Sequence, residues 1–337
     1  MCCKAVIFLS VKEKLDRFKN KKWGIFHHFL GGNDSEKWNE RVNAVDVDLW
    51  ADQLSSLGCG FFGITMMQCG RCMLAPNEAF NRITGYKNGQ ACAERDFVLD
   101  LSDALRKRNI DLMLYFTGDG PCRDSNDIAN KAFGFTTTTP VMVDGNWHSE
   151  QYPEFVPPSF VDKWCEVLSE YADRYGDRVF AWWFDGCWKE LYPDDYREDM
   201  LLKYKNAVRC ANPDVLVTFN GGYNQEKLCR HSIHEDFTAG ETGELLPVPT
   251  ERFVDGSQWF EFLCSAFWWE GGDRSSAVWT GTDDGILRPR FTPEQLRDYV
   301  KAVNEKGGIV MFDTEFVDDR HINKAQFECM SKLKELI

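Results

Sequence analysis

The stretch Val179-Phe180-Ala181-Trp182-Trp183-Phe184-Asp185-Gly186 consists of six apolar residues followed by an acid and a glycine. A short apolar run bounded in this way is typical of a buried strand in a parallel sheet. Successive side chains of a strand point to opposite faces, so Trp182 and Trp183 should separate, one inside the fold and one outside. The acid would stand at the end of this strand, and the glycine after it lets a ligand approach closely.

Similar apolar runs recur along the whole chain and alternate with segments of helical period, which is typical of a parallel sheet covered by helices. The predicted strands are residues 23–28, 59–67, 110–116, 179–185, 215–220, 234–238, 277–280 and 308–312. The predicted helices are residues 47–57, 95–108, 160–175 and 195–211, and one that begins with the capping box of residues 292–295. Residues 260–269 fit either a buried helix or a strand.

Eight β/α steps without an internal Pro-, Gly- or Ser-rich linker predict an α/β fold, a single (β/α)8 TIM-like barrel. We assign residues 1–20 to an N-terminal segment and residues 21–337 to the catalytic barrel. A doubly wound sheet is the alternative, but the Gly-x-Gly-x-x-Gly that would follow its first strand does not occur.

The composition excludes several classes of protein. The 337 residues are 43% apolar and 14% aromatic, which excludes a disordered chain. With 53 acidic and 39 basic residues the net charge is −14, which argues against nucleic acid as a partner. No apolar stretch is long enough to span a membrane. The 13 cysteines form no framework of close spacings, and the short pair Cys69 and Cys72 makes only half a zinc site. We therefore expect free thiols, a cytoplasmic location, no cofactor and no metal ion.

Catalytic side chains of a (β/α)8 barrel stand where strands end and loops begin. Asp185 is the sharpest candidate, because a lone carboxylate among tryptophans is unfavourable unless it is paired or used. Two carboxylates that flank the scissile glycosidic bond, with aromatic rings around them, are typical of glycoside hydrolases. The other polar residues predicted near strand ends are His27, His28, Gln68, Arg71, Asp119, Asn220, Asp236, Glu241, Glu270, Asp313 and Glu315.

Several of these stretches resemble, in the same order, the α-L-fucosidases, the retaining hydrolases of glycoside hydrolase family 29. Trp183-Phe184-Asp185-Gly186 matches the family's Trp-Phe-Asp-Gly, and residues 23–28 are similar to its Phe-Gly-Ile-Phe-x-His-Trp opening. Residues 114–116 are similar to its Leu-Tyr-Tyr-Ser, and residues 236–241 to its Asp-Phe-x-Thr-Pro-Glu. The resemblance extends over roughly residues 22–312.

The resemblance implies that Asp185 is the nucleophile of a double displacement. Glu241, which closes the motif similar to Asp-Phe-x-Thr-Pro-Glu, is the expected acid/base. Glu270 is the alternative, since the tryptophans beside it would raise its pKa. The chain departs from the family at Met67-Gln68-Cys69-Gly70, where the family has a His-His-Asp-Gly that holds sugar hydroxyls. This departure puts fucose as the substrate in doubt more than it does the fold or the nucleophile.

The resulting interpretation is a glycosidase that cleaves a terminal α-L-fucosyl or related modified sugar, with neither nucleic acid nor a membrane as partner. Two alternatives stay open: a barrel that binds carbohydrate without turnover, and a lyase or isomerase that acts on a sugar derivative. Only one of two adjacent strand residues can enter the pocket, and we favour His28 over His27, although the family's register points to His27. The predicted sugar-binding residues are His27, His28, Gln68, Arg71, Tyr115, Trp183, Asn220 and Trp268.

Overall fold

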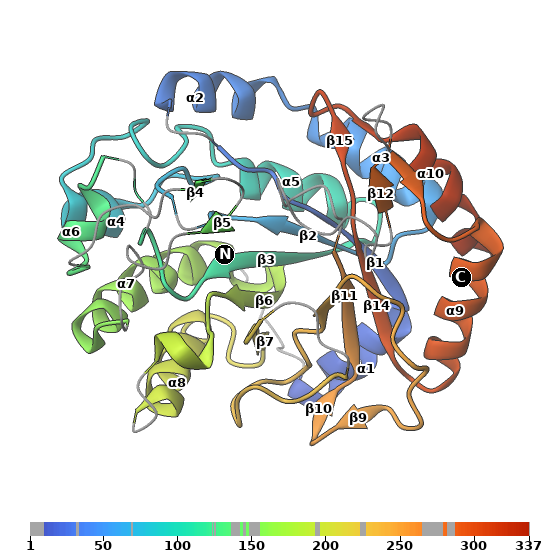
Figure 1. Ribbon diagram of the computed structural model, residues 1–337. Coiled ribbons are helices and arrows are strands. Elements are labelled where there is room, and N and C mark those ends of the chain that lie inside the picture. The colour runs from blue at the N-terminus through green and yellow to red at the C-terminus, as the bar shows by residue number, and fades with distance from the viewer. Residues whose placement is uncertain are drawn as a thin grey trace, which may run out of the picture.

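Eight parallel strands form one curled sheet in the computed structural model (Figure 1). The structure describes residues 10–31, 34–68, 70–122, 124, 126–135, 142–143, 146–147, 156–192, 196–222, 227–264, 279–281 and 287–336. The strand order is β7-β6-β3-β2-β1-β14-β11-β8. These strands are β1 (Trp23–His27), β2 (Phe61–Thr65), β3 (Asp111–Thr117), β6 (Val179–Asp185), β7 (Leu216–Phe219), β8 (Glu241–Thr242), β11 (Phe260–Leu263) and β14 (Ile309–Asp313).

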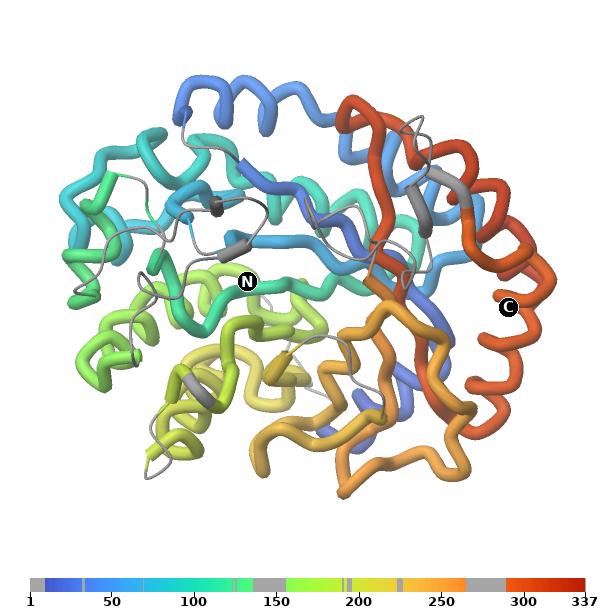
Figure 2. The backbone as a smooth tube through the Cα atoms, viewed as in Figure 1, coloured from blue at the N-terminus to red at the C-terminus, as the bar shows by residue number. Residues whose placement is uncertain are grey.

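The first and last parts of the chain meet within this sheet, because β14 pairs with β1 in parallel (Figure 2). The two ends of the strand order, β7 and β8, share no ladder in the described part of the chain. Just before β8, Asp236 N donates a hydrogen bond to Val217 O on β7 (2.8 Å). The fold is therefore an α/β, barrel-like sheet, and its seam carries this bond in place of the full ladder that a closed TIM barrel would have.

Six of the predicted strands are confirmed within a few residues, and the strand at 179–185 has the predicted bounds. The sixth prediction was wrong, and the predicted seventh strand overlaps a strand that lies outside the parallel sheet. The sixth parallel strand is β8, and within the predicted 234–238 only Phe237 makes an isolated bridge, to Gln258. The seventh is β11, whereas β12 (Trp279–Gly281) pairs in antiparallel with β13 (Leu287–Pro289). Residues 260–269 fitted either a helix or a strand because a short apolar run does not distinguish the two, and residues 260–263 form a strand. Within it, Glu261 is buried and accepts a hydrogen bond from Tyr299 Oη (2.6 Å).

Helices surround the strands (Figure 1). The five predicted helices are confirmed as α3 (Val47–Leu57), α5 (Phe97–Arg106), α7 (Pro158–Tyr175), α8 (Arg197–Val208) and α9 (Pro293–Glu305), and α9 begins with the predicted capping box. The connections on both sides of β8 hold no helix in their described residues. The other helices and strands are α1 (Val11–Lys21), α2 (Ser35–Ala44), α4 (Glu78–Thr84), α6 (Ala129–Ala132), α10 (Lys324–Met330), β4 (Met142–Val143), β5 (Asn146–Trp147), β9 (Phe253–Val254), β10 (Ser257–Gln258), β15 (Phe316–Val317) and β16 (His321–Ile322).

Alternating side chains of the strands build two separate cores. The inner core contains Trp183, Tyr115 and Phe262, enclosed by the curled sheet. The outer core, between the sheet and the helices, contains Trp182 and Phe184. The two adjacent tryptophans therefore separate as predicted, because a strand presents successive side chains to opposite faces.

Helix α1 packs against the inner core at the end of the sheet where the strands begin. Phe18 is fully buried, and its ring centroid lies 5.0 to 5.6 Å from those of Phe61, Phe180, Phe237 and Phe260. Since α1 extends from residue 11 to residue 21, it spans the boundary predicted at residue 20. That domain boundary stays a prediction.

Phe18→Ala is expected to lower the free energy of unfolding by about 3–5 kcal/mol, because it leaves a cavity among four rings. Urea unfolding followed by circular dichroism measures the change. Phe253→Ala, at an exposed position, is the matched control and should have little effect. A loss below about 1 kcal/mol at Phe18 would mean that α1 is not a structural part of the core.

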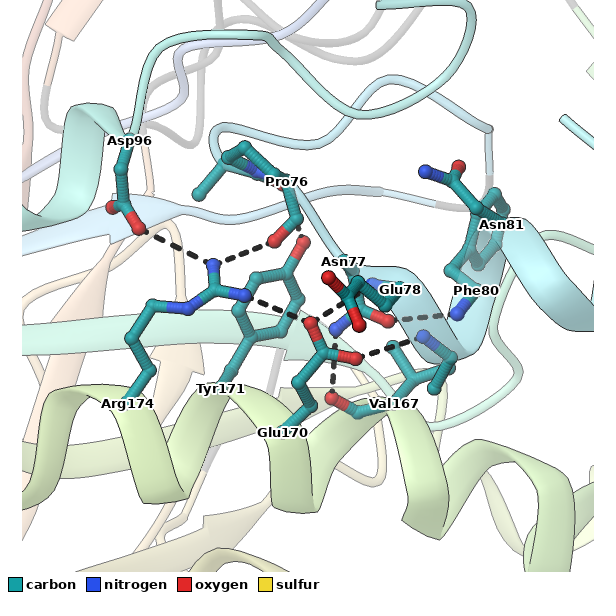
Figure 3. A network of polar contacts seen from close by, with 12 residues as sticks. Pro76, Asn77, Glu78, Phe80, Asn81, Asp96, Val167, Glu170, Tyr171 and Arg174 are labelled. Carbon is teal, nitrogen blue, oxygen red and sulfur yellow. Dashed lines mark hydrogen bonds and ion pairs between the residues drawn. The ribbon is translucent and has the colours of Figure 1, made fainter. Parts of the chain in front are cut away.

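A polar network ties the long connection between β2 and α5 to helix α7 (Figure 3). Arg174 Nη1 donates to Pro76 O (2.6 Å) and to Asp96 Oδ2 (3.2 Å), and its Nη2 donates to Glu170 Oε1 (2.8 Å). The Glu170 carboxylate also accepts from the first two backbone N–H groups of α4, each at 2.8 Å. These bonds anchor the connection that carries Gln68 and Arg71.

Candidate active site

Asp185 ends β6 and holds its carboxylate between two donors from neighbouring strands. Tyr115 Oη, on β3, donates to Oδ2 (2.5 Å), and Asn220 Nδ2, just after β7, donates to Oδ1 (2.8 Å). Tyr115 and Asn220 are buried, whereas Asp185 stays partly exposed. The two bonds therefore orient a carboxylate that a ligand can still reach.

The same Asn220 amide also bonds a second carboxylate, that of Glu241 at the start of β8. Nδ2 donates to Glu241 Oε2 as well as to Asp185. Asn220 Oδ1 accepts from Gly222 N (3.2 Å), so the nitrogen end of the amide is the one that faces the two acids. One side chain thus bridges the two carboxylates that the sequence analysis singled out as nucleophile and acid/base.

Glu241 has the surroundings of an acid that keeps its proton near neutral pH. Burial raises the pKa of Glu241 to about 8, and the carboxylates of Asp185 and Asp313 act in the same direction. Hydrogen bonds from Asn220 Nδ2 and from Cys264 Sγ (3.3 Å, to Oε1) oppose this rise. The balance favours the protonated form.

Aromatic rings form the floor beneath these carboxylates. Trp183 lies two residues before Asp185 on the same face of β6. Its ring stacks on Tyr115 (centroids 5.1 Å apart, planes at 19°) and meets the edge of Phe262 at 5.5 Å. Its indole N–H donates to Ala239 O (3.1 Å). Trp183 is fully buried, so it supports the site from below.

The two adjacent histidines separate as expected for a strand end. His28 points to the inner side, where its ring lies 4.6 Å from that of Phe26 and its Nε2 lies 3.9 Å from Asp313 Oδ2. Burial lowers the pKa of His28, so the ring is neutral. His27 points to the outer side, against Phe316, with its Nδ1 3.0 Å from Thr314 O. Strand alternation therefore turns His27 into the outer core, on the face of the sheet opposite to His28, which argues against the expectation that it binds sugar.

Gln68 and Arg71, the predicted sugar-binding residues after β2, differ in their surroundings. Arg71 forms a buried ion pair with Asp124 (Nη1 to Oδ1, 3.0 Å), and Asp124 Oδ2 also accepts from Tyr86 Oη (2.9 Å). This pairing argues against the expectation that Arg71 is displayed to an anionic sugar substituent. Met67, at a position where the family has an imidazole, is buried and accepts a hydrogen bond from Thr117 Oγ1 (3.0 Å). Gln68 lies in the turn after β2 and is partly buried.

Glu270 and Trp268 lie outside the described residues. No sequence motif marked Cys264, which lies just after β11 and contacts Glu241. The alternation Phe260, Phe262, Cys264 on the inner face would have indicated it, had β11 been recognised as a strand. Asp313 was predicted near a strand end, but its place beside Glu241 and His28 was not.

Each cysteine in the described part of the chain is a free thiol. Among the same residues, no group of three or more His, Cys, Asp and Glu side chains is arranged to hold a metal ion. The helices of these segments include none with the length and apolar character needed to cross a membrane.

Solved structures of fucose-processing enzymes share this fold. The endo-fucoidan hydrolase P5AFcnA from glycoside hydrolase family 107 has a TM-score of 0.63 and 13% identity, over 96% of this chain and 92% of that one. For α-L-fucosidase isoenzyme 1 from Paenibacillus thiaminolyticus the TM-score is 0.63 and the identity 16%, over 97% and 76% of the two chains. For a family 29 α-L-fucosidase from Bacteroides thetaiotaomicron the values are 0.60 and 15%, over 96% and 73%. At these identities the likeness is one of fold.

The sequence itself carries the family signal. No curated protein matches the chain. The family model for α-L-fucosidase, however, matches residues 43–253, which are more than half of the sequence and include both Asp185 and Glu241. The chain therefore belongs to the α-L-fucosidase family.

Proposed function

We propose that this protein is a retaining glycosidase that removes a terminal α-L-fucosyl or related modified sugar, with Asp185 as nucleophile and Glu241 as acid/base. The observation that carries the proposal is the single Asn220 amide that donates to both carboxylates. Both acids are partly exposed, while the rings of Tyr115 and Trp183 beneath them are buried. The two carboxylates are therefore open to a ligand, while the rings close the side beneath them.

The bridging amide favours the retaining geometry. Two oxygens that accept from one nitrogen lie no more than about 6 Å apart, twice the length of an N–H···O hydrogen bond. Retaining glycosidases place their carboxyl groups about 5–5.5 Å apart, whereas inverting enzymes need about 6.5–9.5 Å to admit a water molecule. The pair Asp185 and Glu241 falls on the retaining side.

The surroundings of the two acids support different roles. The pKa of Glu241, raised to about 8 by burial and by Asp185, suits a group that must donate a proton near neutral pH. Asp185 accepts two hydrogen bonds that aim its carboxylate, which suits a nucleophile. Asn220 donates a hydrogen bond to each acid, and it can do so because the end of β6, the end of β7 and the start of β8 lie side by side.

In the proposed reaction, an oxygen of Asp185 attacks the anomeric carbon and the bond to the leaving oxygen breaks. Glu241 gives its proton to that oxygen, so the aglycone departs as a neutral alcohol and a glycosyl ester of Asp185 remains. Water then attacks the same carbon while the Glu241 carboxylate takes its proton. Asp185 leaves as a carboxylate, and the sugar is released with its original anomeric configuration.

Hydrolysis of a panel of 4-nitrophenyl α- and β-glycosides tests the proposal. We expect turnover of the α-L-fucoside or of a closely related α-glycoside, with the α-anomer formed first by proton NMR. A β-anomer formed first would contradict the retaining mechanism. If no glycoside is hydrolysed but free sugars raise the melting temperature, the chain binds carbohydrate without turnover. An unsaturated or isomerised product would indicate a lyase or isomerase.

A further inference from the structure

The acid/base candidate is held by different donors on its two oxygens. Asn220 Nδ2 donates to Oε2 of Glu241, and Cys264 Sγ donates to Oε1 from 3.3 Å. The amide nitrogen can only donate, whereas the thiol sulfur can also accept, so in the protonated acid Oε2 is the acceptor and the acidic proton belongs on Oε1. The oxygen that would exchange protons with the substrate is therefore the one beside the thiol.

The backbone holds Cys264 firmly in this position. Cys264 N donates to Thr242 O (2.8 Å), directly after the parallel pairs Phe262 with Glu241 and Leu263 with Thr242. Alternation along β11 then turns both Phe262 and Cys264 inward. Cys264 is buried, so its thiol and the Glu241 carboxyl face each other with little freedom to separate.

We propose that Cys264 is a positioning residue that fixes Oε1 of Glu241 and controls how tightly this acid holds its proton. The inference rests on the proposed role of Glu241 and deepens it. The charged and titratable groups that face Glu241 in the described residues are Asp185 from β6, Asp313 from β14 and Cys264 itself. The two aspartates favour the protonated acid, and the thiol opposes them by donating to the ionised form.

The thiol is suited to remain a donor throughout the working range of pH. Burial raises the pKa of Cys264 well above its usual value, and the carboxylates of Glu241, Asp313 and Asp185 raise it further. The thiol therefore stays protonated while Glu241 titrates. A thiol is a weak donor, so it stabilises the carboxylate less than a hydroxyl would.

Two substitutions should move the proton affinity of Glu241 in opposite directions. Cys264→Ala removes the donor, which destabilises the ionised acid and shifts the alkaline limb of kcat/KM for 4-nitrophenyl α-L-fucoside to higher pH. Cys264→Ser supplies a stronger donor and shifts that limb to lower pH. We expect each shift to be about 0.5–1 pH unit, the effect of a modest hydrogen bond on a charged acceptor. Cys59→Ala is the matched control, since this buried thiol bonds Phe61 O at the other end of the sheet.

A second measurement needs no substrate. Glu241 has a raised pKa in the folded protein, so its protonated form contributes stability below the unfolded value of 4.5 that is lost as pH rises towards about 8. The melting temperature of each protein minus that of its Glu241→Gln partner should fall over this window and then level off. The levelling point should move up in Cys264→Ala and down in Cys264→Ser.

The outcomes separate this inference from the proposed function. If Glu241→Ala keeps the alkaline limb of the wild type, the acid/base assignment is wrong, whereas the melting series still reports on Cys264. If Glu241→Ala loses the limb but the two Cys264 variants leave the limb and the levelling point in place, or move them in the same direction, Cys264 only fills space.

Discussion

Asp185→Asn is expected to lower kcat for 4-nitrophenyl α-L-fucoside by about 10⁴-fold or more, because an amide cannot attack the anomeric carbon. The variant should still fold. The new amide oxygen can accept from Asn220 Nδ2, and the new amide nitrogen can donate to Tyr115 Oη, which accepts as well as donates. Initial rates, together with the melting temperature of the same preparation, measure the effect.

Asp111→Asn is the matched control for this prediction. Asp111 is also a strand aspartate, but it is buried, begins β3 at the opposite end of the sheet and pairs there with Arg17 and Lys21. Its loss should affect stability and leave kcat within a few-fold of the wild type. In Asp185→Gly, azide should restore turnover and give the fucosyl azide of inverted configuration. Turnover by Asp185→Asn within tenfold of the wild type would rule out Asp185 as the nucleophile.

The strand and helix that the sequence predicts without error have unambiguous ends. The run 179–185 is apolar up to Asp185, and Gly186 then takes a φ of +65°, where a Cβ would also lie only 2.6 Å from Asp119. Helix α3 is bounded by the Asp46 cap and by Gly58 in the left-handed conformation. By contrast, β8 has two residues, too few to show any periodicity. Such a strand is recognised only through its neighbours.

The candidate site is less predictable than the fold because it depends on register between strands far apart in sequence. Asp185 follows from one local stretch, and Glu241 from a motif of the family. That one amide touches both acids depends on how β6, β7 and β8 line up, which no single segment encodes. The inward place of Cys264 likewise follows only once β11 is known to be a strand.

Glu241→Ala is expected to reduce turnover by about 10²–10⁴-fold for substrates with a poor leaving group, since these need protonation of the departing oxygen. The 2,4-dinitrophenolate of a 2,4-dinitrophenyl fucoside departs without protonation, so formation of the glycosyl-enzyme from this substrate should be much less affected. In the wild type, activity should fall as pH rises through about 8, where Glu241 loses its proton. The variant should lose this alkaline limb, and azide should give the fucosyl azide of retained configuration. Plots of kcat/KM against leaving-group pKa and against pH measure these effects.

The comparison that decides the assignment is with Glu270→Ala, because Glu270 is the other acid that the sequence nominates. Glu244→Ala is the control. Glu244 follows Glu241 by three residues and forms an ion pair with Arg290 (2.8 Å). It should therefore leave both plots unchanged. If Glu270→Ala alone gives the steep dependence on the leaving group, Glu270 is the proton donor. Glu241 would then serve to hold Asn220 against Asp185. In that case Glu241→Ala should lower kcat/KM by the same factor for all substrates, because it disturbs the nucleophile rather than protonation of the leaving group.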